Sequence, residues 1–419
     1  MSNGRLPLAL LGLAACSTPG PEVNPDRVAR TITSAEGDLG DVVSGNAKLA
    51  WDIYGELSTG SENLFYSPFS MSAALGMTMA GADGDTLTEM SQVLGVGVPE
   101  ADWHSAMGDV IRDLNGDFDR GYTLHVANRL WGQDGYPFEQ DFLDVCADDY
   151  DAPFEPWDFR ADPDGGRQRV NQWVLEQTEE RIEDLLPGGS VTVDTRLVLA
   201  NAIYFLGDWA FPFDPEDTQD GAFTRIDGST VTAPIMSLDT ENYEEPELSV
   251  GFVDGATVVR LPYQDDEVSM LLVVPDAPDG LPALEAQLDA PTFDGWVDTL
   301  QQGRFMLQMP KFELEYEVDL VPVLATLGMS DAFDGAAANF ERMAMEQPDG
   351  RLHITGVFHK AFVKVDEEGT EAAAATGVVL GVESAPPFVD ATHPFLFVLR
   401  DDLTGSILFV GRVMDPTAG

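Results

Sequence analysis

One stretch of the chain, residues 358–384 (FHKAFVKVDEEGTEAAAATGVVLGVES), constrains the fold more than any other. Its first part alternates between two registers that both carry β-forming residues, which predicts a strand. Four alanines follow, but Gly377–Gly381 does not continue a helix. Instead, every second residue is small or apolar: Thr370, Ala372, Ala374, Thr376, Val378, Leu380 and Val382. This period of two predicts a strand with one buried face that could enter between two neighbours, although the composition equally fits an alanine-rich surface loop.

The segment DEEGTEAAAAT, residues 366–376, resembles the hinge of the reactive-centre loop of the serpins. In that family a target protease cuts the loop, which then inserts as a new central strand. The resemblance implies an α+β serpin fold with about nine helices, three β-sheets and an exposed reactive-centre loop over about 367–392 that inserts into the main sheet. It assigns the hinge to Glu367, Gly369, Thr370, Glu371, Ala372, Ala373, Ala374, Ala375 and Thr376.

Other segments between about Asn46 and Pro416 resemble the same family. Residues 63–70 (NLFYSPFS) match its N-x-x-x-S-P-x-S pattern, and residues 201–209 match Asn-x-x-x-Phe-x-Gly-x-Trp. The resemblance implies a polar cluster beneath the main sheet, called the shutter, made of Ser67, Ser70, Asn201 and His359. Taken alone, each serine would be read as a helix cap, and Ser67 can serve as both.

The resemblance also implies a site at the top of the main sheet, called the breach, where insertion begins. Trp209 would lie there, and Lys311 would pair with Glu367 at the root of the loop. The alternatives are that Trp209 only fills the core and that Lys311 is an ordinary surface lysine.

Local patterns predict the elements around these residues. Helical spacing indicates helices over 46–57, over 72–81 after an opening Pro68, and around 168–181. Alternation indicates a strand over 122–131, and a near-continuous apolar run over 195–205 fits a strand covered on both faces. Paired strands are expected within 257–275, and buried strands at 394–400 and 406–412.

The reactive bond is placed by loop length. Pro394 follows Glu367 by 27 positions, which resembles the common inhibitory loop and puts the cut between Glu383 and Ser384, with a cut after Val382 as the alternative. The partner expected is therefore a serine protease, either Glu-specific or elastase-like. Trypsin-like enzymes should fail, because no Lys or Arg occurs between Lys364 and Arg400.

Two functional classes are open. The first is a suicide inhibitor of serine, or cysteine, endopeptidases; the second is a non-inhibitory serpin-fold protein that acts as a carrier, structural or chaperone-like molecule. The small residues of the hinge favour the inhibitor. The five histidines form no H-E-x-x-H motif, and G-x-S-x-G, Walker A and C-x-x-C motifs do not occur. No catalytic residues, cofactor or metal ligands are therefore expected, and the chain is not predicted to be an enzyme.

The net charge of −51, from 73 acidic and 22 basic residues, argues against nucleic acid, heparin-like polyanions or an anionic membrane as partners of the folded body. A monomer is expected. An Asp-rich, Lys-poor surface suggests an exported protein or a salty habitat, unless it reflects a lineage-wide bias. Two cysteines exclude a disulfide framework, and Cys146 is predicted to be a buried small hydrophobe on a helix.

The N-terminus has the pattern of a targeting segment. Arg5 precedes an apolar run, and Leu13–Cys16 matches a bacterial lipobox, which predicts a signal peptide over 1–15 and lipid on Cys16. An ordinary secretory signal is the alternative. Residues 16–41 are predicted to be a flexible tether and 42–416 a single domain. The expected location is the periplasmic or outer face of a bacterial membrane, reached only through the lipid, or else the secreted fraction.

Overall fold

The computed structural model describes residues 35–116, 121–240, 248–370 and 386–418. The nine α-helices of this part of the chain are α1 (Glu36–Leu57), α2 (Pro68–Ala80), α3 (Gly84–Leu94), α4 (Glu100–Leu114), α5 (Gln140–Tyr150), α6 (Pro163–Gln177), α7 (Leu281–Glu285), α8 (Ala290–Val297) and α9 (Val321–Thr326).

The strands of the same residues are β1 (Leu64–Tyr66), β2 (Tyr122–Gln133), β3 (Phe154–Trp157), β4 (Leu197–Asp208), β5 (Gln219–Thr224), β6 (Thr230–Asp239), β7 (Ser249–Val253), β8 (Ala256–Pro262), β9 (Val268–Pro275), β10 (Gln301–Gln302), β11 (Met306–Pro310), β12 (Phe312–Asp319), β13 (Phe358–Val365), β14 (Gly369–Thr370), β15 (Phe388–Asp390), β16 (Phe395–Asp401) and β17 (Ile407–Val413). Short 3-10 turns lie at Pro215–Asp217, Gln264–Asp266 and Asp331–Phe333.

These strands form four hydrogen-bonded groups within the described ranges. One sheet has the order β1-β17-β16-β9-β8-β7-β10, a second has the order β15-β11-β6-β5, and the remaining strands form β14-β4-β2-β3 and the pair β12-β13. The last two groups are the halves of one expected main sheet. The sequence predicts three sheets, and the fourth group arises because β4 and β13 are not hydrogen-bonded to each other.

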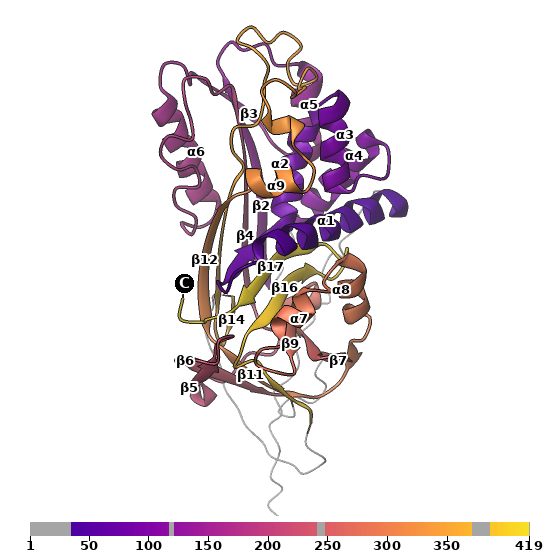
Figure 1. The fold of residues 1–419 in the computed structure, drawn as a ribbon, viewed down its shortest axis with the longest axis vertical. Helices are drawn as coiled ribbons and strands as arrows, with labels where there is room; N and C mark the ends of the chain where they lie inside the picture. The colour runs from indigo at the N-terminus through magenta and orange to yellow at the C-terminus, as the bar shows by residue number, and fades with distance from the viewer. Residues whose placement is uncertain (1–34, 117–120, 241–247, 371–385, 419) are drawn as a thin grey trace, which may run out of the picture.

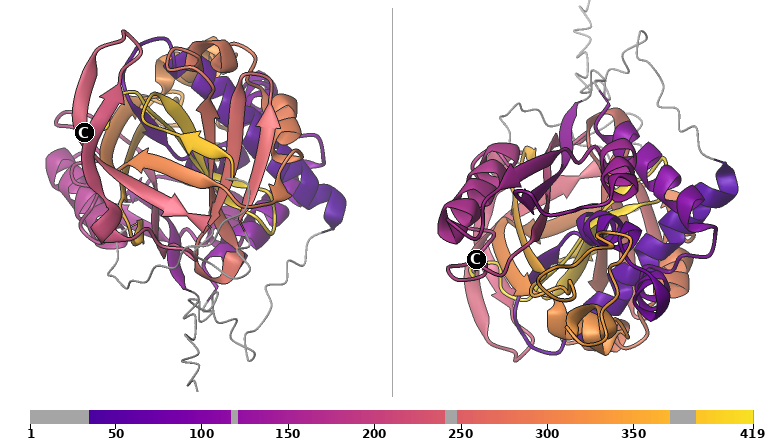
Figure 2. Two further views of the ribbon diagram at one scale, coloured as in Figure 1. Left: turned by 90° about the horizontal axis from the view of Figure 1, so that it is seen from below. Right: turned by 90° about the horizontal axis from the view of Figure 1, so that it is seen from above.

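The helices cover the main sheet on both faces (Figure 1). Helix α6 packs its Val170, Trp173 and Val174 on Ala200 and Ala202 of β4, in a core of its own. On the other face, α2 joins α1, α4, β4 and the seven-stranded sheet in the large core. Figure 2 shows the same layers end-on, with the helices of the N-terminal third grouped on one side.

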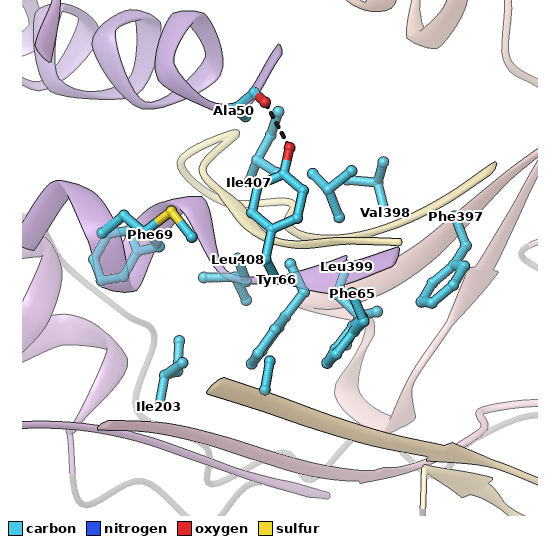
Figure 3. Close-up of a cluster of buried hydrophobic side chains, with 14 of the residues drawn as sticks. Ala50, Phe65, Tyr66, Phe69, Ile203, Phe397, Val398, Leu399, Ile407 and Leu408 are labelled. Atoms are coloured by element: carbon cyan, nitrogen blue, oxygen red, sulfur yellow. Dashed lines mark hydrogen bonds between the residues drawn. The ribbon is translucent and has the colours of Figure 1, made fainter. Parts of the chain in front are cut away.

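A cluster of aromatic and aliphatic side chains fills the junction between α2, β4 and β17 (Figure 3). The ring of Phe65 stacks on Phe409 with centroids 5.1 Å apart, and Phe69 and Ile203 are buried beside them. The hydroxyl of Tyr66 donates to the carbonyl of Ala50 over 2.6 Å, so the one polar group of this cluster is satisfied. The cluster fixes β1 and the start of α2 beneath the main sheet.

Most predicted elements are present, with three corrections. Helix α1 begins at Glu36, so the end of the predicted tether is helical. The cause is tertiary, because the Asp41 carboxylate accepts from the backbone N–H of Gly97 at 3.0 and 3.1 Å, and Val42 is buried. Helix α6, predicted around 168–181, begins at Pro163, because the Asp162 side chain accepts from the N–H of Gly165, and ends at Gln177 before the positive φ angles of Glu179 and Glu180.

The third correction concerns the apolar run of β4. It is not fully covered on both faces, because Leu197–Leu199 and Tyr204 are only half-buried.

Cys146 is buried on α5 as predicted, and burial raises the pKa of its thiol well above the usual range.

The predicted signal peptide and Cys16 lie outside the described residues. No helix within those residues is both long and apolar enough to cross a membrane.

Candidate functional site in the divided main sheet

The division of the main sheet leaves two strand edges without a full ladder within the described ranges. Strand β4 pairs with β2 from Gly132↔Leu197 to Tyr122↔Gly207, and among the described residues its other edge pairs with the two residues of β14. Strand β13 pairs with β12 and, in the described part of the chain, with no other strand. Buried backbone groups are almost always paired, so two such edges inside one protein are ready to accept a further strand.

The two edges border one narrow cavity of about 20 Å³. Residues 203–205 of β4 and 362–364 of β13 line its two sides, and Thr178, Arg181 and Ile182 cover it from the segment after α6. Thr370 also lines this cavity. Because the volume suffices for about one water molecule, β4 and β13 must move apart before a strand can enter.

The four predicted shutter residues lie together at this division. The hydroxyl of Ser67 caps α2 by accepting from the N–H of Ser70 (3.0 Å) and donates to the carbonyl of Leu408 (2.7 Å). The N–H of Ser67 donates to Nε2 of His359 over 3.1 Å. Since His359 belongs to β13, the start of α2 is bonded to one side of the division.

The other side of the division is bonded to α2 as well. The hydroxyl of Ser70 donates to Oδ1 of Asn201 in β4, and Nδ2 of Asn201 donates to Oδ1 of Asn128 in β2 over 2.6 Å. Asn128 in turn donates to the carbonyl of Tyr150 over 2.9 Å. Serines three residues apart on α2 thus hold β4 and β13 at a fixed separation.

His359 is neutral in this setting. Burial lowers the pKa of its imidazole to about 4. The Nε2 atom accepts the Ser67 N–H, which requires the unprotonated nitrogen at that position.

The predicted breach residues also lie together, around residues 366–368. The ammonium of Lys311 donates to Oε2 of Glu367 over 2.5 Å. Burial would raise the pKa of Glu367, but the hydrogen bond from Lys311 and further hydrogen bonds outweigh it, so the pKa is lowered. The indole N–H of Trp209 donates to the carbonyl of Asp366 over 3.1 Å, and its backbone N–H donates to that of Glu368 over 2.8 Å.

Two residues of the predicted hinge already belong to the main sheet. Gly369 and Thr370 pair antiparallel with Asp208 and Gly207. Thr370 is 4% exposed, and its hydroxyl lies 2.9 Å from the hydroxyl of Tyr263. The ring of Tyr263 stacks on Trp209 with centroids 4.5 Å apart, which joins the breach to the hinge.

Gly369 is required by the close approach of β14 to β4. A Cβ atom at this position would lie 2.1 Å from the carbonyl oxygen of Gly207. Its φ of +157° is also one that side chains with a Cβ rarely adopt.

The remaining predicted site residues lie outside the described residues: Glu371, Ala372, Ala373, Ala374, Ala375, Thr376, Val382, Glu383 and Ser384. Two residues of the site carried no role in the sequence analysis, Asn128 and Tyr263. A buried asparagine inside the alternating strand 122–131 is a signal that could have identified the first. Nothing local distinguishes Tyr263 from a core aromatic.

The chain is similar to known proteins in sequence and in fold. The family model described as "Serpin (serine protease inhibitor)" matches residues 44–416. Serpin B8 of Homo sapiens is 37% identical over 362 residues, which cover 85% of this chain and 94% of that protein. The leukocyte elastase inhibitor of Xenopus tropicalis is 36% identical, covering 84% and 93%. The crystal structure of human thyroxine-binding globulin superposes with a TM-score of 0.79 at 29% identity, covering 91% of this chain and 100% of that one.

Proposed function

Because the chain belongs to the serpin family, and its fold is the serpin fold expected from the sequence, we propose that it is a suicide inhibitor of serine, or cysteine, endopeptidases. The proposed reactive bond joins Glu383 and Ser384. A target serine hydroxyl attacks the carbonyl carbon of Glu383, the bond to the nitrogen of Ser384 breaks, and the new amine leaves with the proton taken by the protease histidine. The protease is then held to the inhibitor as an ester.

The observation that carries this proposal is the pair of facing edges of β4 and β13, with Thr370 at the cavity between them. After the cut, the residues that follow Thr370 continue the strand that β14 begins. Each inserted residue pairs backbone groups on both neighbours and buries an alternate small side chain. Insertion carries the tethered protease away from the hinge and distorts its active site, so that the ester is not hydrolysed.

The same geometry supports a kinetic barrier before the cut. The side chains at the division leave a cavity of only about 20 Å³, and Ser67 and Ser70 hold its two strands through His359 and Asn201. Separation of β4 and β13 breaks these hydrogen bonds before any new hydrogen bond to an inserted strand forms. The uncut protein is therefore proposed to be metastable, with a lifetime set by the barrier.

A second candidate function is a non-inhibitory carrier, because one structural neighbour is thyroxine-binding globulin, crystallised with thyroxine. The two candidates differ in the fate of the cut loop. Inhibition requires fast insertion, and the inward hinge positions Thr370, Ala372, Ala374 and Thr376 carry no bulky, charged or proline residue. The hinge therefore favours the inhibitor.

A protease panel tests the proposal. The protein is incubated with a Glu-specific protease, an elastase-like protease and trypsin, and each mixture is run on a denaturing gel. A gel-stable complex with one of the first two supports inhibition, and the mass of the released peptide locates the cut: a peptide that starts at Ser384 supports a cut after Glu383, and one that starts at Glu383 supports a cut after Val382. Efficient trapping of trypsin, or cleavage without any complex, contradicts the proposal.

The location is a separate proposal. Cys16 is proposed to carry lipid that anchors the inhibitor to the outside of a membrane, since Leu13–Cys16 has the lipobox pattern. The variant Cys16→Ser should move the protein from the membrane fraction to the soluble fraction. A parent protein that is wholly soluble with an unmodified Cys16 contradicts the anchor and leaves the inhibitory proposal intact.

A further inference from the structure

The outer face of the sheet β15-β11-β6-β5 carries two exposed apolar side chains side by side. Met306 of β11 and Phe388 of β15 are register partners, so their side chains share a face. They are 37% and 55% exposed. Neighbouring large apolar side chains that are both exposed are unusual on a soluble protein and mark interaction surfaces more often than isolated ones do. In Figure 1 this sheet lies at the lower end of the molecule.

A polar groove lies beside this apolar pair on the same sheet. It has a volume of about 460 Å³, and its lining includes Gly221, Ile235, Ser237 and Gln308. Gln308 lies two residues after Met306 on the same strand and therefore on the same face. The carboxylates of Asp217 and Asp220 also line the groove and are exposed, and neither forms an ion pair with the part of the chain that the structure describes.

The position of this surface relates it to the reactive bond. Phe388 follows Ser384 by four positions, and an extended chain spans at most about 3.6 Å per residue. A protease seated on the proposed bond therefore has its active-site cleft within roughly 15 Å of Phe388. Since a protease is much wider than this distance, its surface beside the cleft faces the end of this sheet.

We propose that the Met306–Phe388 pair and the adjoining groove form a second contact surface for the target protease, which takes an apolar side chain on the pair and a lysine or arginine side chain in the groove. This inference rests on the proposed inhibitory function and adds to it a determinant of specificity outside the loop. Phenylalanine and methionine are enriched at interfaces, and a few such anchors carry most of the binding energy. The acidic groove complements a basic partner and speeds its approach.

The test separates recognition from trapping. The association rate constant and the stoichiometry of inhibition are measured with the panel protease that forms the gel-stable complex. The double variant Met306→Ser/Phe388→Ser should lower the association rate constant by about 10-fold, while the stoichiometry stays that of the parent. The variant Asp217→Asn/Asp220→Asn should lower the rate constant by about 3-fold at low salt and by much less at about 1 M salt.

Matched controls lie on the other large sheet. Phe252 on β7 is 61% exposed, and Asp276 and Asp279 are exposed after β9, so Phe252→Ser and Asp276→Asn/Asp279→Asn remove similar groups elsewhere. The inference is overturned when the Met306/Phe388 variant keeps the parent rate constant, or when the controls lower it equally. It is also overturned if the pair proves to be a self-association surface, seen as a parent dimer that the variant loses with no change in rate. A parent that traps no protease instead refutes the proposed function.

Discussion

The hydroxyl groups of Tyr263 and Thr370 lie 2.9 Å apart, and this contact lies where Thr370, the first inward residue of the predicted hinge, pairs with β4 in the main sheet. Burial raises the pKa of Tyr263 well above its usual range, so the phenol stays neutral. Because the same ring stacks on Trp209, the hinge, the breach and the end of β4 form one packed unit. In the proposed mechanism, loop insertion therefore has a starting point before any protease arrives.

A charged residue at this starting point should block insertion. The variant Thr370→Arg places a guanidinium where the native side chain is 4% exposed, in a cavity that Arg181 and Lys364 also line, at a cost of several kcal/mol. Insertion becomes slower than hydrolysis of the ester that joins the protease to the inhibitor. We therefore expect several molecules of the variant to be cut for each protease molecule inactivated. A densitometric titration of protease against inhibitor on a denaturing gel measures this ratio. Thr370→Ser, which keeps the hydroxyl, should match the parent, and a Thr370→Arg protein that traps as well as the parent would show that Thr370 is not part of the hinge.

The ion pair between Lys311 and Glu367 should stabilise the closed breach. Its atoms are 2.5 Å apart and the Glu367 side chain is 10% exposed, so a double-mutant cycle of Lys311→Met and Glu367→Gln should give a coupling free energy of roughly 1 kcal/mol in urea unfolding. Because the pKa of Glu367 is lowered on folding, the stabilisation from this ion pair depends on pH. It is present above the unfolded pKa of 4.5 and is lost as the pH falls through the folded pKa.

The exposed pair Lys48–Asp52 on α1 is the reference for that cycle. Its side chains are 46% and 40% exposed, so its coupling should stay near about 0.3–0.5 kcal/mol. Equal coupling free energies at the two sites would contradict a special role for Lys311.

The sequence predicted those parts of the site that depend on local pattern. Alternation located β13, and Ser67 caps α2 with Pro68 at its first turn as expected. The contacts of Asn128 and Tyr263 were missed, because they depend on the pairing of strands that are far apart in the sequence. Asn128 meets Asn201 across β2 and β4, and Tyr263 meets Thr370 from a different sheet.

The start of α1 was missed for a similar reason. Its first turns carry few apolar residues. They are held in place by the hydrogen bond from the backbone N–H of Gly97, which follows α3 in the sequence, to the Asp41 carboxylate. The local sequence pattern also does not predict the division of the main sheet. Both β4 and β13 have sequences that favour ordinary sheet strands. The three-dimensional register shows that, among the described residues, one edge of β4 pairs with just the two residues of β14 and one edge of β13 with no strand.

Stability should depend on the protonation of His359. Its folded pKa of about 4 lies below the unfolded value of 6.5, so the unfolded state binds the proton more tightly. The neutral imidazole contributes its full share of the free energy of unfolding above pH 6.5, and this share is lost as the pH falls toward 4. The total loss is on the order of 3 kcal/mol. Urea unfolding at pH values between 4 and 7 measures the slope, which His359→Gln should reduce.

His393 provides the internal control for this experiment. Burial lowers its pKa as well, so it adds to the slope in the parent and in the variant alike. The difference between the slopes of the parent and the variant therefore measures the contribution of His359 to the pH dependence of unfolding. A variant with the parent's slope would show that this imidazole does not titrate between the two states.

Cleavage of the loop should raise the melting temperature, because the facing edges of β4 and β13 gain a shared partner. Each backbone hydrogen bond contributes about 1 kcal/mol net, so an inserted strand should raise the apparent melting temperature by roughly 10 °C or more. A nonspecific protease that cuts within 376–384 supplies the cut protein, and mass spectrometry confirms the position. Trypsin is the matched control, since residues 365–399 hold no site for it. The cut form of Thr370→Arg should rise less than the cut parent, because the arginine opposes entry at the cavity that Thr370 lines. An unchanged or lower melting temperature of the cut parent would mean that β4 and β13 do not receive the loop.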